Sequence, residues 1–162
     1  MFREMRRNTK ELTREEAVEM LETQLYGTLA LNSENGYPYA VPLSYVWIDG
    51  MICFHGAIAG QKFDILQKDG RASFCVVQQN AIQPAKFTTF FRSAIAYGTV
   101  RIVADEARVN RVMRAFLDKY SPGHIEAGLK YIDASRSRFC VSEMTIEHLA
   151  GKGLPKTGEE RD

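Results

Sequence analysis

The sequence predicts a mainly β protein in which an antiparallel β-barrel is flanked by helices. Three observations support this fold class. Strand-like segments outnumber helical ones and do not alternate with them as βαβ units would. Asp49-Gly50 is a turn dipeptide that favours a tight hairpin between two strands. The long strand-like run 89–103 carries Gly98 near its middle, and the wall of a small barrel needs such a bend because it must coil.

The first element expected is a helix over residues 14–24. Thr13-Arg14-Glu15-Glu16 has the Thr-x-x-Glu form of a capping box, and apolar residues follow at helical spacing. Gly27 ends this helix, and residues 28–31 begin the first strand. The turn-rich run 32–36 closes that strand.

A hairpin comes next, with strands over 37–48 and 51–55, rich in Tyr, Val, Trp and Ile. A short helix over 61–67 follows it. The continuous apolar run 72–77 predicts a strand that is buried on both faces. Residues 79–88, which include a proline, are expected to form a loop before the long strand 89–103.

Asp105 is placed to cap a helix over 106–120, whose apolar residues recur at steps of three and four. Ser121-Pro122 resembles a second helix start with proline in the first turn, which predicts a shorter helix to residue 132. The last strand is expected over 138–149. The domain organisation is then an N-terminal arm (1–12), one barrel domain (13–150) and a C-terminal tail (151–162).

Composition narrows the class of protein. A chain of 162 residues is sufficient for one domain with a core, and a net charge of +1 gives no reason to expect nucleic acid or an anionic membrane as partner. No apolar run is long enough for a signal peptide or a membrane span, so we expect a cytoplasmic protein. Cys53, Cys75 and Cys140 are far apart among apolar neighbours, which favours buried thiols over disulfides. With three histidines and no cluster of ligands, no metal site is expected.

The segment between His55 and Lys62 is the candidate for binding chemistry. It passes from a strand through small residues into a helix, and a helix start offers free N–H groups and the positive end of a dipole to an anion. Lys62 would add a full charge. The alternative is an ordinary strand-to-helix connection with a solvated lysine. A Walker A loop is absent, because only three residues separate Gly56 from Gly60 and no Ser or Thr follows Lys62.

These motifs together resemble a known family. The residues concerned are Gly36-Tyr37-Pro38-Tyr39, Val41-Pro42-Leu43-Ser44-Tyr45, Phe54-His55-Gly56-Ala57, Gly60-Gln61-Lys62, Asp64 and Ala72-Ser73-Phe74. The run is similar to the FMN-binding split-barrel proteins related to pyridoxamine 5'-phosphate oxidase. Within them it most resembles the 5-nitroimidazole-resistance branch, the NimA/NimC type.

The resemblance implies a six-stranded antiparallel split β-barrel that holds FMN at a homodimer interface. It implies cofactor contacts from Val41, Pro42, Leu43, Ser44, His55, Gly56, Ala57, Gly60, Gln61 and Lys62, with Gln78 reaching the flavin of the partner subunit. Relatives that oxidise pyridoxamine phosphate carry Arg-Lys where this chain has Gln61-Lys62, and a basic residue at each end of the segment matching 39–44. Fewer phosphate-binding cations here weaken the case for that substrate.

The function expected from this resemblance is that of an FMN-dependent oxidoreductase acting on a small molecule, such as a nitroimidazole or another nitroaromatic. His55 is the candidate catalytic residue, against the alternative of a hydrogen-bonded structural histidine. The aromatic hairpin serves either as core or dimer interface, or as a platform for the flavin. Two other functions stay open: a flavin- or haem-binding protein without turnover, and a deazaflavin-dependent reductase.

Overall fold

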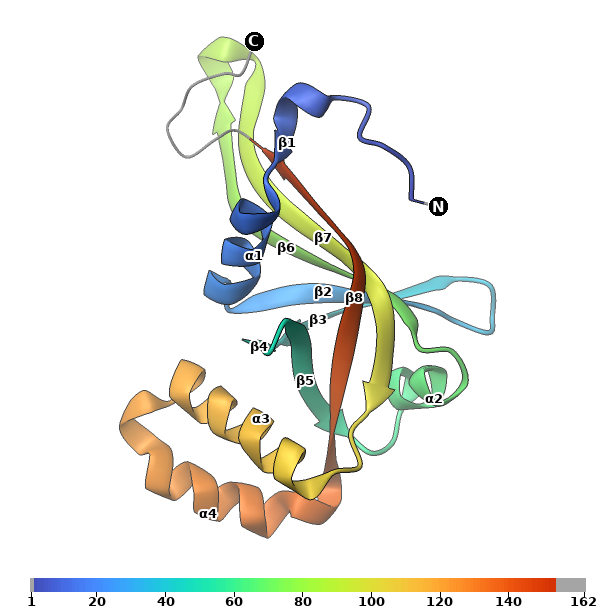
Figure 1. The fold of residues 1–162 in the computed structure, drawn as a ribbon, viewed down its shortest axis with the longest axis vertical. Helices are drawn as coiled ribbons and strands as arrows, with labels where there is room; N and C mark the ends of the chain where they lie inside the picture. The colour runs from blue at the N-terminus through green and yellow to red at the C-terminus, as the bar shows by residue number, and fades with distance from the viewer. Residues whose placement is uncertain (1, 154–162) are drawn as a thin grey trace.

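The computed structural model describes residues 2–153, which form a single curled antiparallel sheet with helices around it (Figure 1). The sheet has eight strands, with seven in the order β3-β2-β6-β7-β8-β5-β4 and β1 paired to β8. Their bounds are β1 Glu11–Leu12, β2 Tyr26–Asn32, β3 Pro38–Ser44, β4 Val46–Ile48, β5 Met51–Ala57, β6 Arg71–Gln83, β7 Thr88–Ile102 and β8 Phe139–Gly153. The predicted split-barrel fold is confirmed, with more strands than the six expected because two short ones, β1 and β4, join the sheet.

The sheet must curl because its two outermost strands are neighbours in the chain. β3 and β4 stand at opposite ends of the strand order, yet only Tyr45 separates them in sequence. Tyr45 is fully buried and packs edge-on against Phe74, with 4.8 Å between the ring centroids. The connection therefore brings the two edges of the sheet together around the core.

This break corrects the hairpin predicted over 37–55. Residues 37–48 do not form one strand: β3 pairs with β2, and only β4 pairs with β5. The turn itself is as predicted, since Asp49 and Gly50 have φ angles of 54° and 75°, and two positive φ angles suit the twist of a tight hairpin.

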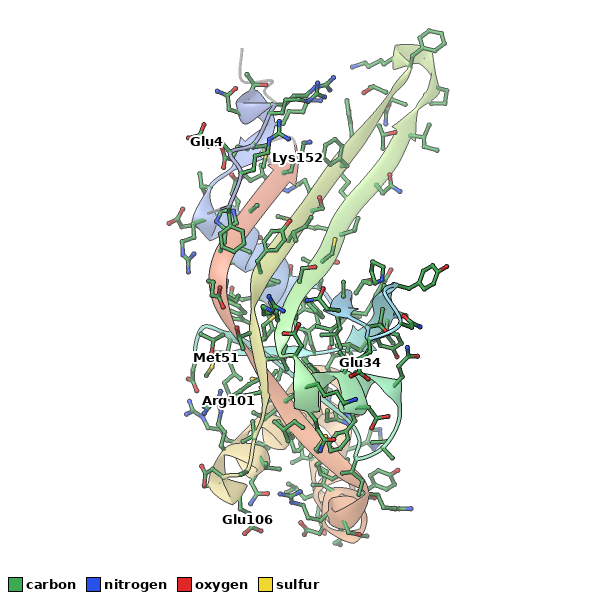
Figure 2. The ribbon with its side chains drawn as sticks, turned by 90° about the vertical axis from the view of Figure 1, so that its right-hand side faces the viewer. Glu4, Glu34, Met51, Arg101, Glu106 and Lys152 are labelled. Atoms are coloured by element: carbon green, nitrogen blue, oxygen red, sulfur yellow. The ribbon has the colours of Figure 1, made fainter. Side chains whose placement is uncertain are left out.

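The long hairpin of β6 and β7 forms an arm that projects from the body (Figure 2). The predicted loop 79–88 is wrong for most of its length, because pairing continues from Gln79 with Arg92 to Gln83 with Thr88. Val77, predicted to be buried, has 53% of its surface exposed. At the tip, Phe87 is 98% exposed.

Gly98 occupies the expected bend, where the pairing of β7 with β8 shifts its register. A β-carbon at Gly98 would lie 1.9 Å from the backbone oxygen of Thr145, which no side chain tolerates. The glycine thus allows two coiled strands to approach each other closely.

The four α-helices are α1 Arg14–Thr23, α2 Gln61–Lys68, α3 Glu106–Tyr120 and α4 Ile125–Ser135. α1 starts with the predicted capping box, in which Thr13 and Glu16 exchange hydrogen bonds of 2.9 and 3.2 Å, and it packs on β7 and β8. Asp105 caps α3 as expected, accepting from the Arg108 N–H at 3.1 Å. α4 differs from its prediction, because residues 122–124 form a 3-10 turn and Ser121 makes no side-chain cap.

Two hydrophobic clusters support these elements. The larger lies inside the curled sheet under α1, and the smaller joins α3 and α4 to β4, β5 and β8. The smaller cluster borders a buried carboxylate, because Glu143 is 1% exposed and accepts from Arg101 and Arg108, each at 2.9 Å. Cys53 is buried beside this carboxylate, whereas Cys75 and Cys140 are half-buried and all three thiols are free.

β8 ends at Gly153, so residues 151–153 belong to the sheet and not to the tail that the sequence predicts. Gly151 pairs with Leu12 of β1, which attaches the end of the predicted N-terminal arm to the barrel. Residues 154–162 lie outside the described residues. None of the helices described is long and apolar enough to cross a membrane.

Candidate functional site

Lys62 lies in the first turn of α2, and its side chain crosses the end of β5. A β-carbon added at Gly56 would stand 2.6 Å from the Lys62 Nζ and 3.1 Å from its Cε, so the bare glycine surface is what makes room for the lysine. The ammonium also lies 5.5 Å from the centre of the Phe54 ring. Burial lowers the pKa of Lys62. An anion beside this ammonium would offset that loss of hydration.

The start of α2 adds backbone donors next to this ammonium. Gly60 precedes the helix with a φ of 106°, and no side chain caps the helix. The first helical bond runs from the Asp64 N–H to the Gly60 oxygen at 3.0 Å, so the N–H groups of Gln61, Lys62 and Phe63 precede it. Asp64 is the one acidic group of this turn and opposes an anion there. The residues present fit a phosphate group held by one ammonium and a helix start.

His55 stands at the end of β5, opposite Val141 of β8. Its ring meets the rings of Phe116 and Phe139 edge-on, with centroid distances of 4.7 and 6.1 Å. Burial against these rings lowers the pKa of His55, and the Lys62 charge lowers it further. The lowered pKa favours the neutral imidazole, although His55 as a whole is an exposed residue.

Cys140 completes the surroundings of Lys62. It pairs with Gly56 across β5 and β8, and its Sγ lies 3.9 Å from the Ala57 oxygen. Burial raises the pKa of this thiol, and the Lys62 ammonium opposes the rise. A raised pKa favours the thiol over the reactive thiolate.

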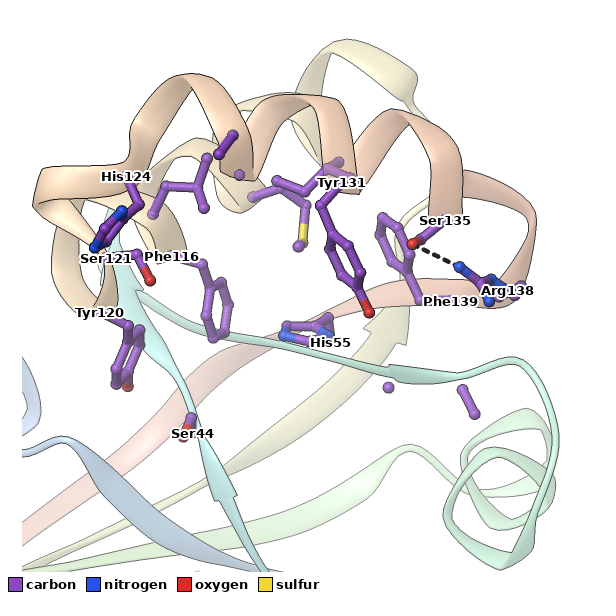
Figure 3. Close-up of a pocket in the computed structure, with 17 residues that line it drawn as sticks. Ser44, His55, Phe116, Tyr120, Ser121, His124, Tyr131, Ser135, Arg138 and Phe139 are labelled. Atoms are coloured by element: carbon purple, nitrogen blue, oxygen red, sulfur yellow. Dashed lines mark hydrogen bonds between the residues drawn. The ribbon is translucent and has the colours of Figure 1, made fainter.

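A cavity of about 1070 Å³ opens beside His55, between the strand ends and the pair of helices α3 and α4 (Figure 3). Its wall is mostly apolar and aromatic, with His55, Gly56 and Ala57 supplied by β5 and Ser44 by β3. The remaining lining residues are Met113, Phe116, Leu117, Tyr120, Ser121, His124, Ala127, Gly128, Tyr131, Ile132, Ser135, Arg138 and Phe139. A large apolar cavity with a few polar groups is typical of a small-molecule site.

The end of α3 is fixed to the junction between β3 and β4. The Tyr120 hydroxyl accepts from the Tyr45 N–H at 3.0 Å and lies 2.6 Å from the carbonyl oxygens of both Leu25 and Tyr45. Lys119 donates to the Gln24 and Tyr45 carbonyls at 2.7 and 3.1 Å. These bonds hold the helical wall of the cavity against the barrel, and Ser44 lies at their edge.

The structure brings together only some of the site residues named from the sequence. Ser44, His55, Gly56 and Ala57 line the cavity, and Lys62 lies against Gly56. Val41 and Leu43 pack on the core, so only their backbone faces outward with Pro42. Gly60 and Gln61 are exposed at the start of α2.

Gln78 lies elsewhere on the same chain. Its side-chain oxygen accepts from the buried Arg92 at 3.0 Å, next to Glu16 of α1, and it is not among the residues that line the cavity.

The helical wall was missed as a site. The sequence indicated the stripe containing Met113 and Phe116 only as the apolar face of a helix. Both residues pack in the smaller core cluster, and both also line the cavity. His124 and Arg138 carried the only visible signals, as a histidine after a helix start and an arginine at a strand start.

Within residues 2–153, no group of three or more His, Cys, Asp or Glu side chains could hold a metal ion.

The curled eight-stranded sheet, with a lysine-bearing helix start beside an aromatic cavity, defines a split β-barrel. Residues 13–152 match the family model described as pyridoxamine 5'-phosphate oxidase. The chain therefore belongs to the pyridoxamine 5'-phosphate oxidase family, and it has that family's flavin-binding fold.

Solved structures share this fold at low sequence identity. A conserved hypothetical protein from Mycobacterium tuberculosis aligns with a TM-score of 0.82 and 19% identity, over 96% of this chain and 94% of that one. A candidate 5-nitroimidazole antibiotic resistance protein from Bacteroides thetaiotaomicron gives 0.75 and 15%, over 88% and 85%. A FAD and haem binding protein from Mycobacterium smegmatis gives 0.67 and 23%, over 89% and 73%. No curated protein matches the sequence.

Proposed function

We propose that this protein is an FMN-dependent oxidoreductase that reduces small electron-poor aromatic molecules, nitroaromatics among them. The observation that carries the proposal is the position of Lys62. Its ammonium lies over Gly56, and its charge acts on His55. Gly56 and His55 both line the aromatic cavity. A phosphate-binding group and an aromatic chamber thus meet at one strand end. A phosphorylated ring cofactor requires that combination.

Each part of the site has a separate role in this proposal. Lys62 and the N–H groups of the first α2 turn hold the phosphate, while the outward backbone of residues 41–44 lies along the ring. Bound flavin supplies the two-electron chemistry. The lowered pKa of His55 favours the neutral imidazole, whose ring N–H can donate a hydrogen bond to an oxygen of the substrate without adding charge. The apolar wall of α3 and α4 excludes water from the reacting groups.

A homodimer is part of the same proposal. Large apolar side chains are exposed along the projecting arm, with Ile82 75% and Phe87 98% accessible. A second copy of the chain would cover them, and a partner's arm would carry its Gln78 toward the flavin. Sedimentation of the protein with and without FMN would measure this assembly.

The first test is the anchor. Lys62→Ala removes one charge-assisted contact to phosphate, which is worth about 1.5–3 kcal/mol, so FMN affinity should fall about ten- to a hundredfold. Lys68→Ala, at the other end of α2 where Lys68 pairs with Glu34, removes the same charge and should leave FMN affinity unchanged. Equal affinities of wild type and Lys62→Ala would contradict the assigned site.

A second candidate function is that of a flavin- or haem-binding protein without turnover. Two observations support this second function. A FAD and haem binding protein from Mycobacterium smegmatis has a similar structure. His55 and His124 both lie in the cavity wall. Photoreduction followed by stopped-flow reoxidation separates the two functions. Reoxidation that accelerates with nitroaromatic concentration supports the oxidoreductase, whereas an acceptor-independent rate supports the binding protein. Mass spectrometry of the bound cofactor distinguishes FMN from a deazaflavin.

A further inference from the structure

We propose that the cavity between α3, α4 and β5 binds planar aromatic acids, with the carboxylate at Arg138 and the ring against Phe116 and Phe139 beside His55. This inference deepens the proposed function, on which it rests for what happens to the bound molecule. Binding of the acid itself requires only the residues of the cavity wall.

The charge of the wall favours an anion. Of the described residues that line the cavity, none is Asp or Glu, while Arg138 and two histidines are present. Lys62, whose charge acts on His55, adds a further cation nearby. Two acids of these helices are already paired: Glu126 with Lys130 at 2.8 Å and Asp118 with Arg114 at 2.9 Å. A cationic ligand would find no counter-charge in this wall.

Arg138 is oriented without being neutralised. Its Nη2 donates to the Ser135 Oγ at 2.9 Å, and Ser135 is only 6% exposed, so the hydroxyl fixes the guanidinium at one end of the cavity (Figure 3). No carboxylate within residues 2–153 forms an ion pair with Arg138. A guanidinium with free donors matches the two oxygens of a carboxylate.

The shape of the wall favours a flat ring. Phe116 and Phe139 stand on either side of His55, and Tyr131 on α4 turns its hydroxyl toward His55 across the cavity (Figure 3). Tyr131 remains 71% exposed, although it is a large aromatic side chain with apolar neighbours. A planar ring between Tyr131 and the phenylalanines would bury the faces of all three, as offset aromatic pairs prefer.

The test compares two ligands of nearly the same size and shape, one with an anionic carboxylate and one with a neutral amide. Isothermal titration of the flavin-free protein with 4-nitrobenzoate and with 4-nitrobenzamide should show the acid binding at least about tenfold more tightly, as a charge-assisted hydrogen bond predicts. Arg138→Gln should remove this preference by weakening the acid about ten- to a hundredfold, with the amide unchanged. Lys130→Gln is the matched control, because it removes one positive charge from the outer face of α4 and should leave both affinities as in wild type.

Any of three results would overturn the inference. The first is equal affinity for acid and amide in the wild type, and the second is an acid affinity that Arg138→Gln leaves unchanged. The third is equal weakening of the acid by Arg138→Gln and Lys130→Gln, which would assign the preference to overall charge. The same experiment distinguishes failure of the proposed function from failure of this inference. If FMN does not bind but 4-nitrobenzoate binds through Arg138, the proposed function fails and the site for aromatic acids is supported. If FMN binds and the acid shows no dependence on Arg138, only this inference fails.

Discussion

Gly56→Ala should weaken flavin binding by displacing the Lys62 ammonium, without removing any charged or polar group. The new β-carbon would stand 2.6 Å from the Lys62 Nζ, whereas ordinary contacts begin near 3.4 Å, so the ammonium must move by about 0.8 Å. The atom that moves is the end of a flexible side chain, and alanine is favoured over glycine in a strand by about 0.5–1 kcal/mol. The fold should therefore tolerate the change.

The expected cost falls on the phosphate contact. A displaced ammonium keeps part of its attraction, so FMN affinity should drop about tenfold, toward the low end of the loss expected for Lys62→Ala. Quenching of FMN fluorescence during titration measures both constants. Gly123→Ala is the control, because its β-carbon meets no atom within 4 Å.

The double variant tests the mechanism. If Gly56 acts only by giving Lys62 its place, then Gly56→Ala in the Lys62→Ala background should cost nothing further, since neighbouring groups are not additive. Additive losses would refute the reasoning, and so would wild-type affinity in Gly56→Ala.

The remaining predictions concern His55 and the buried Tyr45. NMR titration should give His55 a pKa below 6.5 that rises in Lys62→Met but not in Lys68→Met, because the Lys62 charge is one cause of the depression. Since the folded state then binds fewer protons than the unfolded state, His55 should cost stability as the pH falls below 6.5, and His55→Gln should lessen that loss in urea unfolding. Tyr45→Phe should raise the free energy of unfolding by about 1 kcal/mol, because the Tyr45 hydroxyl is buried without a hydrogen-bond partner in residues 2–153; a loss of stability in Tyr45→Phe would reveal an unseen partner.

Elements with strong local signals were predictable from the sequence. The helix over 106–120 has both a capping aspartate and an unbroken apolar stripe, and its bounds agree with α3. The bend at Gly98 was predicted because a barrel wall must coil. The structure shows why the residue is glycine, since the backbone of Thr145 lies too close for a β-carbon.

Elements decided by distant contacts were not predictable. Nothing in the run 37–48 marks a break at Tyr45, because the break depends on pairing with β2 and on bonds from Lys119 and Tyr120. The prediction of a loop over 79–88, where the structure has the arm, was wrong for a related reason. Residues 79–83 lack the alternation of a half-buried strand, since the arm projects from the body and has no core face to specify that pattern.

The candidate site also has one part that local sequence predicts and another that depends on distant contacts. A helix start with a lysine is a local feature, so the chain alone was enough to propose residues 60–62 as an anion site, and that site stays a prediction. The cavity is not local, because a helical stripe that packs and one that lines a chamber have the same spacing in sequence. Gly56 belongs to both classes: its neighbours suggested a cofactor contact, but only the structure shows that its missing side chain is the space that Lys62 occupies. The end of β5 therefore makes room for Lys62 because residue 56 has no β-carbon. A methyl group at residue 56 is a sharper test of the proposed anchor than Lys62→Ala, because it changes the position of the ammonium and keeps its charge.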